Sequence, residues 1–138
     1  MPFYKISEME NKHLNVGPAV VKTVAGDLMK VGIVTYLKGE GATPHFHPNE
    51  EQFVLMLEGK RYVILGDEER IVGPGDLIHI PRNTRHGGRT IDEKAVFFAA
   101  KSPCGDGDLS QDYNKANDAE EIIQHLEQKL VDISNKKE

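Results

Sequence analysis

Short apolar segments separated by turn residues make up the chain as far as residue 103. Residues 29–36 carry apolar side chains at alternating positions, which predicts a strand with at least one buried face. The continuous apolar runs 53–57 and 95–100 have the length and content of buried strands. Short strands at near-regular spacing, with Gly, Pro and Asp turns between them, predict an all-β barrel or sandwich. The remaining strands are expected at 16–24, 60–65, 68–72 and 77–80.

The C-terminal part of the chain follows a different pattern. Residues 102–117 are polar and contain Pro and Gly, which indicates a loop. Apolar residues then recur at helical spacing, namely at Ile122, Ile123, Leu126 and Leu130. We therefore expect one amphipathic C-terminal helix over about 119–132, packed on the barrel or on a partner subunit.

Three segments follow from these patterns. Residues 1–15 are polar with a few apolar side chains, and they are expected to form an N-terminal arm or strand. Residues 16–103 are expected to form the barrel, and residues 104–138 the loop and the helix. A chain of 138 residues suits one domain with its own core.

Composition and charge exclude several classes of protein. The net charge of −5 and a pI of about 5.7 argue against a nucleic-acid-binding surface. No apolar run approaches the length of a membrane-spanning helix, which is about 20 residues, and the N-terminus lacks the apolar core of a signal peptide. Cys104 is the only cysteine, so no internal disulfide can form and a reducing compartment is favoured. We expect a cytoplasmic protein with no nucleic-acid or membrane partner.

The candidate chemistry begins with two histidines that are separated by one residue. His45 and His47 lie between Pro44 and Pro48, which favour an extended backbone. Side chains two residues apart in an extended chain point to the same side. Both imidazoles can therefore face one point in space.

Two motifs around these histidines resemble those of the cupin superfamily, the small double-stranded β-helix barrels. The first reads Gly, five residues, His-x-His, three or four residues, Glu, six residues, Gly. Its positions are occupied by Gly39, His45, His47, Gln52 in place of Glu, and Gly59. The second reads Gly, five residues, Pro-x-Gly, two residues, His, three residues, Asn. Its positions are occupied by Gly75, Pro81, Asn83 in place of Gly, His86, and Thr90 in place of Asn.

The resemblance implies a jelly-roll-like barrel that holds one divalent transition metal per subunit. Its implied ligands are His45, His47, Gln52 and His86. Neutral imidazole is a common ligand of zinc, nickel, iron, manganese and copper, so the ligand set does not identify the metal. A Gln ligand is uncharged, which leaves the full +2 charge at the site, and it cannot act as a general base.

Glu51 competes with Gln52 for the place of the fourth ligand. Glu51 follows His47 by four residues, which fits the looser spacing of the family, whereas the count of six residues to Gly59 selects Gln52. The neighbouring Glu50 also competes for the same place.

Other side chains are candidates for proton transfer or substrate contact. The candidates for proton transfer are Lys101, Tyr36 and Glu51. Arg82 and Arg85 precede His86, and either one can clamp a carboxylate or phosphate if it faces the mouth of the barrel. Phe46, between the first two histidines, is a candidate for contact with the substrate.

The implied ligand set is similar to that of cupins that open unsaturated uronate rings in pectin and alginate breakdown. Those cupins carry an acidic residue on the last strand, where Ala99 stands here, and a Phe where Lys101 stands. We expect a metal-dependent enzyme that acts on a small keto, enol or carboxylate substrate by isomerisation, tautomerisation or dehydration. The alternatives are an iron-dependent cupin dioxygenase and a non-catalytic module that binds a sugar or an acid. The N-terminal segment and the C-terminal helix favour a homodimer.

Overall fold

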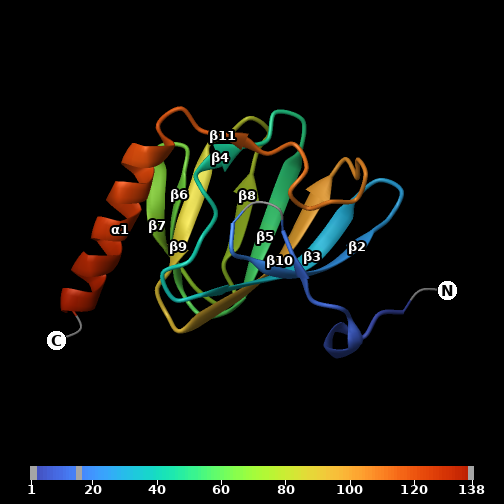
Figure 1. Ribbon diagram of the computed structural model, residues 1–138, viewed down its shortest axis with the longest axis horizontal. Coiled ribbons are helices and arrows are strands. Elements are labelled where there is room, and N and C mark those ends of the chain that lie inside the picture. Colours follow the sequence, from blue (N-terminus) through green and yellow to red (C-terminus); the bar gives the residue numbers. More distant parts are fainter. Residues whose placement is uncertain (1–2, 15–16, 137–138) are drawn as a thin grey trace.

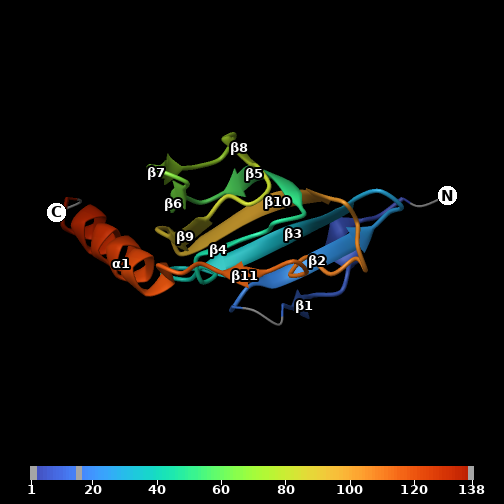
Figure 2. The same ribbon diagram turned by 90° about the horizontal axis from the view of Figure 1, so that it is seen from above.

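The computed structural model describes residues 3–14 and 17–136 and consists of two facing β-sheets and a C-terminal helix (Figures 1 and 2). The larger sheet contains, in spatial order, β1 (Lys12–His13), β2 (Val20–Ala25), β3 (Lys30–Leu37), β10 (Lys94–Ser102), β5 (Glu51–Glu58) and β8 (Leu77–Ile80). The smaller sheet contains β11 (Asn114–Lys115), β4 (His45–Phe46), β9 (His86–Thr90), β6 (Arg61–Leu65) and β7 (Glu68–Val72). This arrangement confirms the expected all-β, jelly-roll-like barrel.

Alternation of side chains along the long strands decides what faces the interior. On β5, positions 52, 54 and 56 are buried and the positions between them are exposed. On β3, the buried set includes Lys30, Val34 and Tyr36, whereas Val31 and Ile33 lie on the half-buried outer face. The interior is therefore mainly apolar, but it receives a few polar side chains from the same inward-facing positions. The buried apolar core of the barrel comprises Ala19, Val21, Val34, Tyr36, Val54, Met56, Val72, Ile80, Ala95, Phe97, Ala99 and Leu109.

Two of the motif glycines lie in turns whose backbone conformation favours glycine. Gly59 and Gly75 have φ angles of 74° and 92°, in the left-handed region that glycine occupies without strain. Asn83, which replaces the motif glycine, also has a positive φ of 58°, and Asn tolerates this conformation better than most residues. The Asn83 amide donates to the His47 carbonyl oxygen at 2.7 Å, so this turn holds the histidine segment in place.

The helix α1 (Ala119–Lys136) packs on the barrel of its own chain and extends four residues beyond the end expected from the sequence. Leu126 is fully buried against Tyr62, Ile64 and Ile91, which project from the outer side of the smaller sheet. The apolar stripe of the helix is therefore covered by the barrel. Within the described part of the chain, no helix combines the length and the apolar character needed to cross a membrane.

The segments at the two ends of the barrel are more structured than the sequence indicated. A short 3-10 helix, η1 (Ile6–Glu8), precedes β1, and β1 pairs with β2, so the N-terminal segment adds an edge strand. Residues 1, 2, 15 and 16 of this region, and residues 137–138 at the other end, lie outside the described residues. The expected loop 102–117 contributes β11, which pairs with β4, and buries Leu109 in the core. The expectation of an unstructured loop there was incomplete.

Candidate metal centre

Three histidines meet at one end of the barrel interior. His45 on β4 lies directly opposite His86 on β9 in the strand ladder, and His47 follows β4 by one residue. The ring centroids are 4.4 Å apart for His45 and His86, 4.8 Å for His45 and His47, and 5.3 Å for His47 and His86. One ring nitrogen from each residue lies within 4.8 Å of the other two, and all three side chains are buried. This spacing is compatible with one shared cation.

Backbone carbonyl groups orient all three rings in the same way. Each Nδ1 lies at hydrogen-bond distance from a carbonyl oxygen, which can only accept, so Nδ1 carries the proton. Each Nε2 is then left with a free lone pair, which is the form that binds a metal. The Nδ1 partners are Thr43 at 2.6 Å for His45, Asp112 at 3.0 Å for His47 and Thr84 at 2.9 Å for His86.

Burial keeps the three imidazoles neutral. Removal from water lowers the pKa of His45 from 6.5 to about 4, and it lowers the pKa of His47 to about 3 with help from the nearby Lys101 ammonium group. Burial also lowers the pKa of His86 well below its usual value, assisted by the proximity of His45. At neutral pH the cluster consequently needs no deprotonation before it can accept a cation.

Gln52 faces the same cavity as two of the histidines from the opposite sheet. Its side chain is buried and lines the same cavity as His45 and His86. Its Oε1 atom has no hydrogen-bond partner among the described residues, and neither has the Nε2 atom of His47. Buried polar atoms without partners are costly unless something absent from the protein itself satisfies them. A divalent metal with nitrogen and oxygen ligands fits this donor set.

Glu51 lies on the wrong face of β5 for both roles considered from the sequence. Side-chain alternation turns Gln52 inward and Glu51 outward, where the Glu51 carboxylate is 2.7 Å from the His79 Nε2 atom. Glu51 is therefore neither a fourth ligand nor a proton-transfer group inside the barrel. Side chains along a strand point alternately to its two faces, so Glu51 and Gln52 cannot both face the interior.

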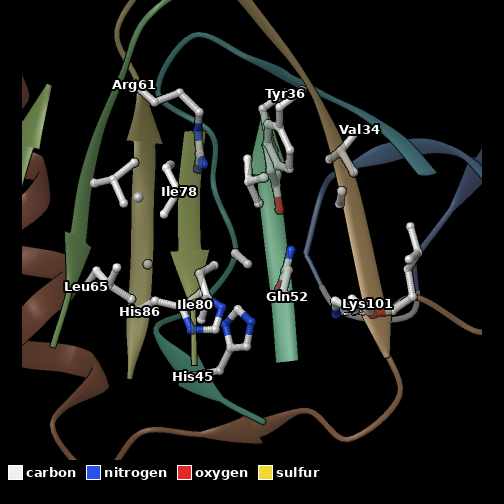
Figure 3. Close-up of a pocket in the computed structure, with 18 of the residues that line it drawn as sticks. Val34, Tyr36, His45, Gln52, Arg61, Leu65, Ile78, Ile80, His86 and Lys101 are labelled. Atoms are coloured by element: carbon white, nitrogen blue, oxygen red, sulfur yellow. Dashed lines mark hydrogen bonds between the residues drawn. The ribbon is translucent and has the colours of Figure 1, made fainter. Parts of the chain in front are cut away.

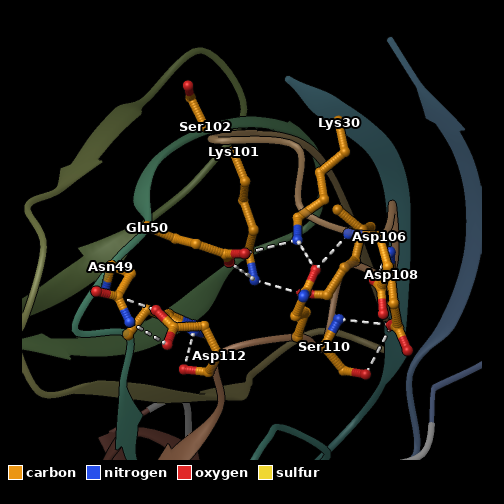
Figure 4. Close-up of polar contacts among 12 residues, drawn as sticks. Lys30, Asn49, Glu50, Lys101, Ser102, Asp106, Asp108, Ser110 and Asp112 are labelled. Carbon is orange, nitrogen blue, oxygen red and sulfur yellow. Dashed lines mark hydrogen bonds and ion pairs between the residues drawn. The ribbon is translucent and has the colours of Figure 1, made fainter. Parts of the chain in front are cut away.

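Glu50 instead forms a buried ion-pair network beside the histidines (Figure 4). Its Oε2 atom is 2.6 Å from the Lys30 ammonium group, and its Oε1 atom is 3.9 Å from that of Lys101. Burial lowers the pKa of Lys101 to about 8, against the opposing influence of the Glu50 carboxylate. Glu50 also lies in a second group of candidate ligands with His47 and Asp112. The contact between Lys30 and Glu50 could not be predicted from the sequence pattern.

A cavity of about 110 Å³ leads from the histidines into the barrel (Figure 3). Most of its lining is apolar, and the polar side chains lie towards its ends. Gln52 and Lys101 project near His45 and His86, whereas Arg61 lies at the opposite end beside Tyr36. Burial raises the pKa of the Tyr36 phenol, so Tyr36 stays protonated and can donate a hydrogen bond.

Three residues considered for substrate contact do not line this cavity. Arg85 is held by an ion pair with Asp118 and by a hydrogen bond to the Gly66 carbonyl oxygen at 2.7 Å, so it anchors the start of α1. Arg82 is exposed, and Phe46 is half-buried on the strand position that alternates with His45. Arg61 was not among the predicted site residues, although alternation along the strand places Arg61, Val63 and Leu65 on one face.

Comparison with protein families matches residues 32–100 to the cupin domain. Among curated proteins, the chain is similar to the pectin degradation protein KdgF of Dickeya dadantii (strain 3937). The two are 33% identical over 81 residues, which are 59% of this chain and 73% of that protein.

Two solved structures resemble the barrel. The structure of KdgF from Halomonas sp. has a TM-score of 0.69 and 26% identity, and the match covers 75% of this chain and 94% of that chain. The polyketide cyclase RemF from Streptomyces resistomycificus has a TM-score of 0.66 and 24% identity, over 75% of this chain and 80% of that chain. At this level of identity the second likeness shows the fold alone.

Proposed function

This chain belongs to the cupin family, and we propose that it is a metal-dependent enzyme for a small, polar, sugar-acid-like substrate. The reaction that we assign is isomerisation, tautomerisation or dehydration of a compound with keto, enol or carboxylate oxygens. One observation carries this proposal. Three neutral imidazoles lie together, and two of them line the same cavity as Gln52, whose amide oxygen has no hydrogen-bond partner among the described residues.

In this proposal His45, His47, His86 and Gln52 hold one divalent transition metal per chain. Such a metal supplies Lewis acidity towards the oxygens of a bound substrate. Because imidazole and amide ligands are neutral, none of these four side chains reduces the positive charge of the site. The backbone carbonyls behind the rings fix the orientation of the histidines before any cation arrives.

Two side chains along the cavity carry protons that a substrate can exchange. Lys101 lies opposite Gln52 in the ladder between β10 and β5, so its ammonium group is close to the histidine end. The Tyr36 hydroxyl lies further along the same cavity. We assign proton transfer to Lys101 and orientation of the substrate to Tyr36, since Gln52 holds no transferable proton.

Two arguments support the proposed substrate class, namely the Lewis acidity of a bound metal and the similarity of the chain to KdgF. A keto or carboxylate group offers the oxygen atoms that a Lewis acid polarises. The naming of KdgF for pectin degradation supports a sugar-acid-like compound. Ala99 stands where the uronate-opening cupins carry an acid, so Lys101 takes on the proton chemistry in our proposal.

The proposal is tested by turnover of a short panel of keto and unsaturated uronic acids. The full-length protein is loaded in turn with zinc, nickel, manganese or ferrous iron, and substrate loss is followed by NMR. We expect turnover that requires the metal and is lost in His47→Ala, whereas His79→Ala, which alters an exposed histidine on the outer face, keeps it.

Two other outcomes separate the alternative functions. Tight binding of an acid without turnover under any metal would overturn the enzymatic proposal and leave a binding module. Oxygen consumption with iron alone would replace the proposed reaction by a dioxygenase reaction.

We also propose that the chain forms a homodimer, through the outer face of the larger sheet. Leu77, Leu55 and Phe98 lie side by side across β8, β5 and β10, and Leu77 is 66% exposed. An apolar row of this kind on an outer sheet face suits a second copy related by a two-fold axis. Light scattering should give twice the chain mass, and Leu55→Glu should give the monomer. A monomeric wild type would contradict this assignment.

A further inference from the structure

Arg61 occupies the end of the cavity that lies opposite the histidines. Arg61, Val63 and Leu65 alternate along β6 and all three line the cavity. Leu65 pairs with His86 in the strand ladder. The backbone of Arg61 therefore lies four residues, or about 13 Å, along β6 from the position opposite His86. Figure 3 shows the Arg61 side chain entering the cavity from one end, with His45 and His86 at the other.

Among the residues that the structure describes, the guanidinium group of Arg61 has no acidic partner. The residue is only 8% exposed, yet no ion pair or side-chain hydrogen bond joins it to any other residue in the ranges 3–14 and 17–136. Its Nε atom is buried and unsatisfied. Lys30 and Arg85 form ion pairs with Glu50 and Asp118. The buried Arg89 forms no ion pair, but it donates to the carbonyl oxygens of Ala42 and Gly88. Among the described residues Arg61 has neither kind of partner, so its burial needs a physical explanation.

Aromatic rings hold the guanidinium group without neutralising it. The Arg61 Cζ atom is 4.8 Å from the ring centroid of Tyr36 and 5.5 Å from that of Phe97. Stacking on ring faces uses the flat faces of the guanidinium group and leaves its N–H edge available. A Cβ atom at position 88 would lie 3.1 Å from the Arg61 Nη2 atom, so Gly88 provides the room that the group occupies.

A buried cation that is oriented but unpaired is a binding site for an anion. Burial of an unpaired charge is unfavourable, and an anion that arrives with the correct shape removes this penalty. The planar fork of arginine matches the two oxygens of a carboxylate. Between Arg61 and the histidines the cavity is lined by apolar side chains such as Val63, Ile78 and Ile80, which suits a short carbon skeleton.

We propose that Arg61 and Tyr36 form a carboxylate subsite that fixes the direction in which the substrate enters the barrel. This inference rests on the proposed function. It adds a carboxylate to the substrate, at the end that lies away from the histidines. The substrate would then be a short acid whose carboxylate lies at Arg61 and whose reacting oxygens lie towards His45 and His86.

Calorimetric titration with butanoate and its uncharged isostere butanamide tests the subsite. The full-length protein is titrated with each compound, both zinc-loaded and after removal of metal, with circular dichroism as the check of folding. Arg61→Met removes the charge at similar volume, and Arg61→Lys keeps the charge but loses the planar fork. Arg82→Met is the matched control, because Arg82 is exposed and lies outside the cavity lining.

We expect metal-free wild type to prefer butanoate over butanamide by roughly 10- to 100-fold, the range for hydrogen bonds to a charged group. Arg61→Met should lose this preference, Arg61→Lys should keep part of it, and Arg82→Met should keep all of it. Equal binding of the two compounds, or an unchanged preference in folded Arg61→Met, would overturn the subsite. Because the titration needs no metal, its result is independent of whether the metal-dependent function stands.

Discussion

The two ends of the barrel cavity differ in charge and in the groups that hold their polar side chains. At one end, three histidines are neutral, and backbone carbonyl groups hold them with their Nε2 lone pairs free. At the other end, Arg61 is a full positive charge that two aromatic rings hold with its N–H edge free. Both ends keep buried polar atoms without partners among the described residues.

The two ends of the cavity therefore suit ligands of opposite charge. Neutral imidazoles are less costly to bury than a charged group, and their free Nε2 atoms gain strongly from a cation, so the histidine end is suited to a metal. A buried guanidinium is costly by itself and gains from an anion, so the other end is suited to a carboxylate. A substrate that spans the cavity would contact both ends, and variants at each end should therefore fail in different ways.

The largest expected effect is on metal affinity at the histidine end. His45→Ala should weaken zinc binding by more than about 100-fold, because loss of a group that only supports a ligand already costs 10- to 100-fold. Competition with a chromophoric chelator measures this change. His79→Ala, on the exposed face of β8, should bind zinc as the wild type does, and a similar loss in both variants would point to misfolding rather than to ligation.

A smaller loss is expected at the fourth ligand. Gln52→Ala should weaken zinc binding by about 10-fold, since three histidines remain and only one amide oxygen is removed. Glu51→Ala is the matched control, because Glu51 is adjacent in sequence but faces outward. If Glu51→Ala loses as much affinity as Gln52→Ala in the same chelator competition, the assignment of the inward face is wrong.

The pH dependence of stability should separate the two ends. In metal-free protein, burial lowers the pKa of His45 to about 4 and that of His47 to about 3, whereas the unfolded chain titrates near 6.5. Above pH 6.5 neither state binds these protons. As the pH falls below 6.5 the unfolded chain takes them up first, so the free energy of unfolding should decrease from about pH 6.5 down to about pH 3.

Denaturant unfolding at a series of pH values measures this slope. His45→Gln should flatten it, because one of the titrating groups is gone. Arg61→Met should keep the wild-type slope, because its effect lies at the other end of the cavity. An unchanged slope in His45→Gln would contradict the buried, neutral state of this histidine.

The smallest expected effect is on stability at the Arg61 end. In the absence of metal and carboxylate, Arg61→Met should raise the free energy of unfolding by about 1 kcal/mol, since an apolar side chain of similar volume replaces an unpaired buried charge. Urea unfolding measures the change. Destabilisation of Arg61→Met by a similar amount would mean that stacking on Tyr36 and Phe97 outweighs the cost of burying the charge.

Part of the histidine end could be predicted from the sequence, because two of its histidines belong to one short extended segment. His45 and His47 share a face in any extended segment, whereas His86 and Gln52 were expected at the same site only because the two motifs resemble those of the cupins. The same alternation rule decided against Glu51 once the inward face of β5 was known. Most of the longer strands and the C-terminal helix were likewise predicted from apolar patterning, whereas β4, β9 and β11 and the order of the strands in the two sheets were not.

The role of Arg61 could not be predicted from the sequence, because it depends on which side chains lie near the guanidinium group in the fold. A sequence shows that an arginine follows a turn, but not that its side chain enters the barrel without an acid beside it. Similarly, Lys30 and Glu50 are 20 residues apart, and their pairing depends on which face of β3 is buried. Long-range contacts of this kind follow from sheet register, which periodicity alone does not specify.

The most direct test of the central claim is elemental analysis of the protein purified without chelator, with the wild type and His86→Ala prepared in parallel. If the histidines and Gln52 hold a cation, the wild type should contain about one equivalent of a divalent transition metal per chain, and the variant should contain almost none. A folded wild type that remains free of metal even after incubation with zinc, nickel, manganese and iron, or equal metal content in both proteins, would contradict the account.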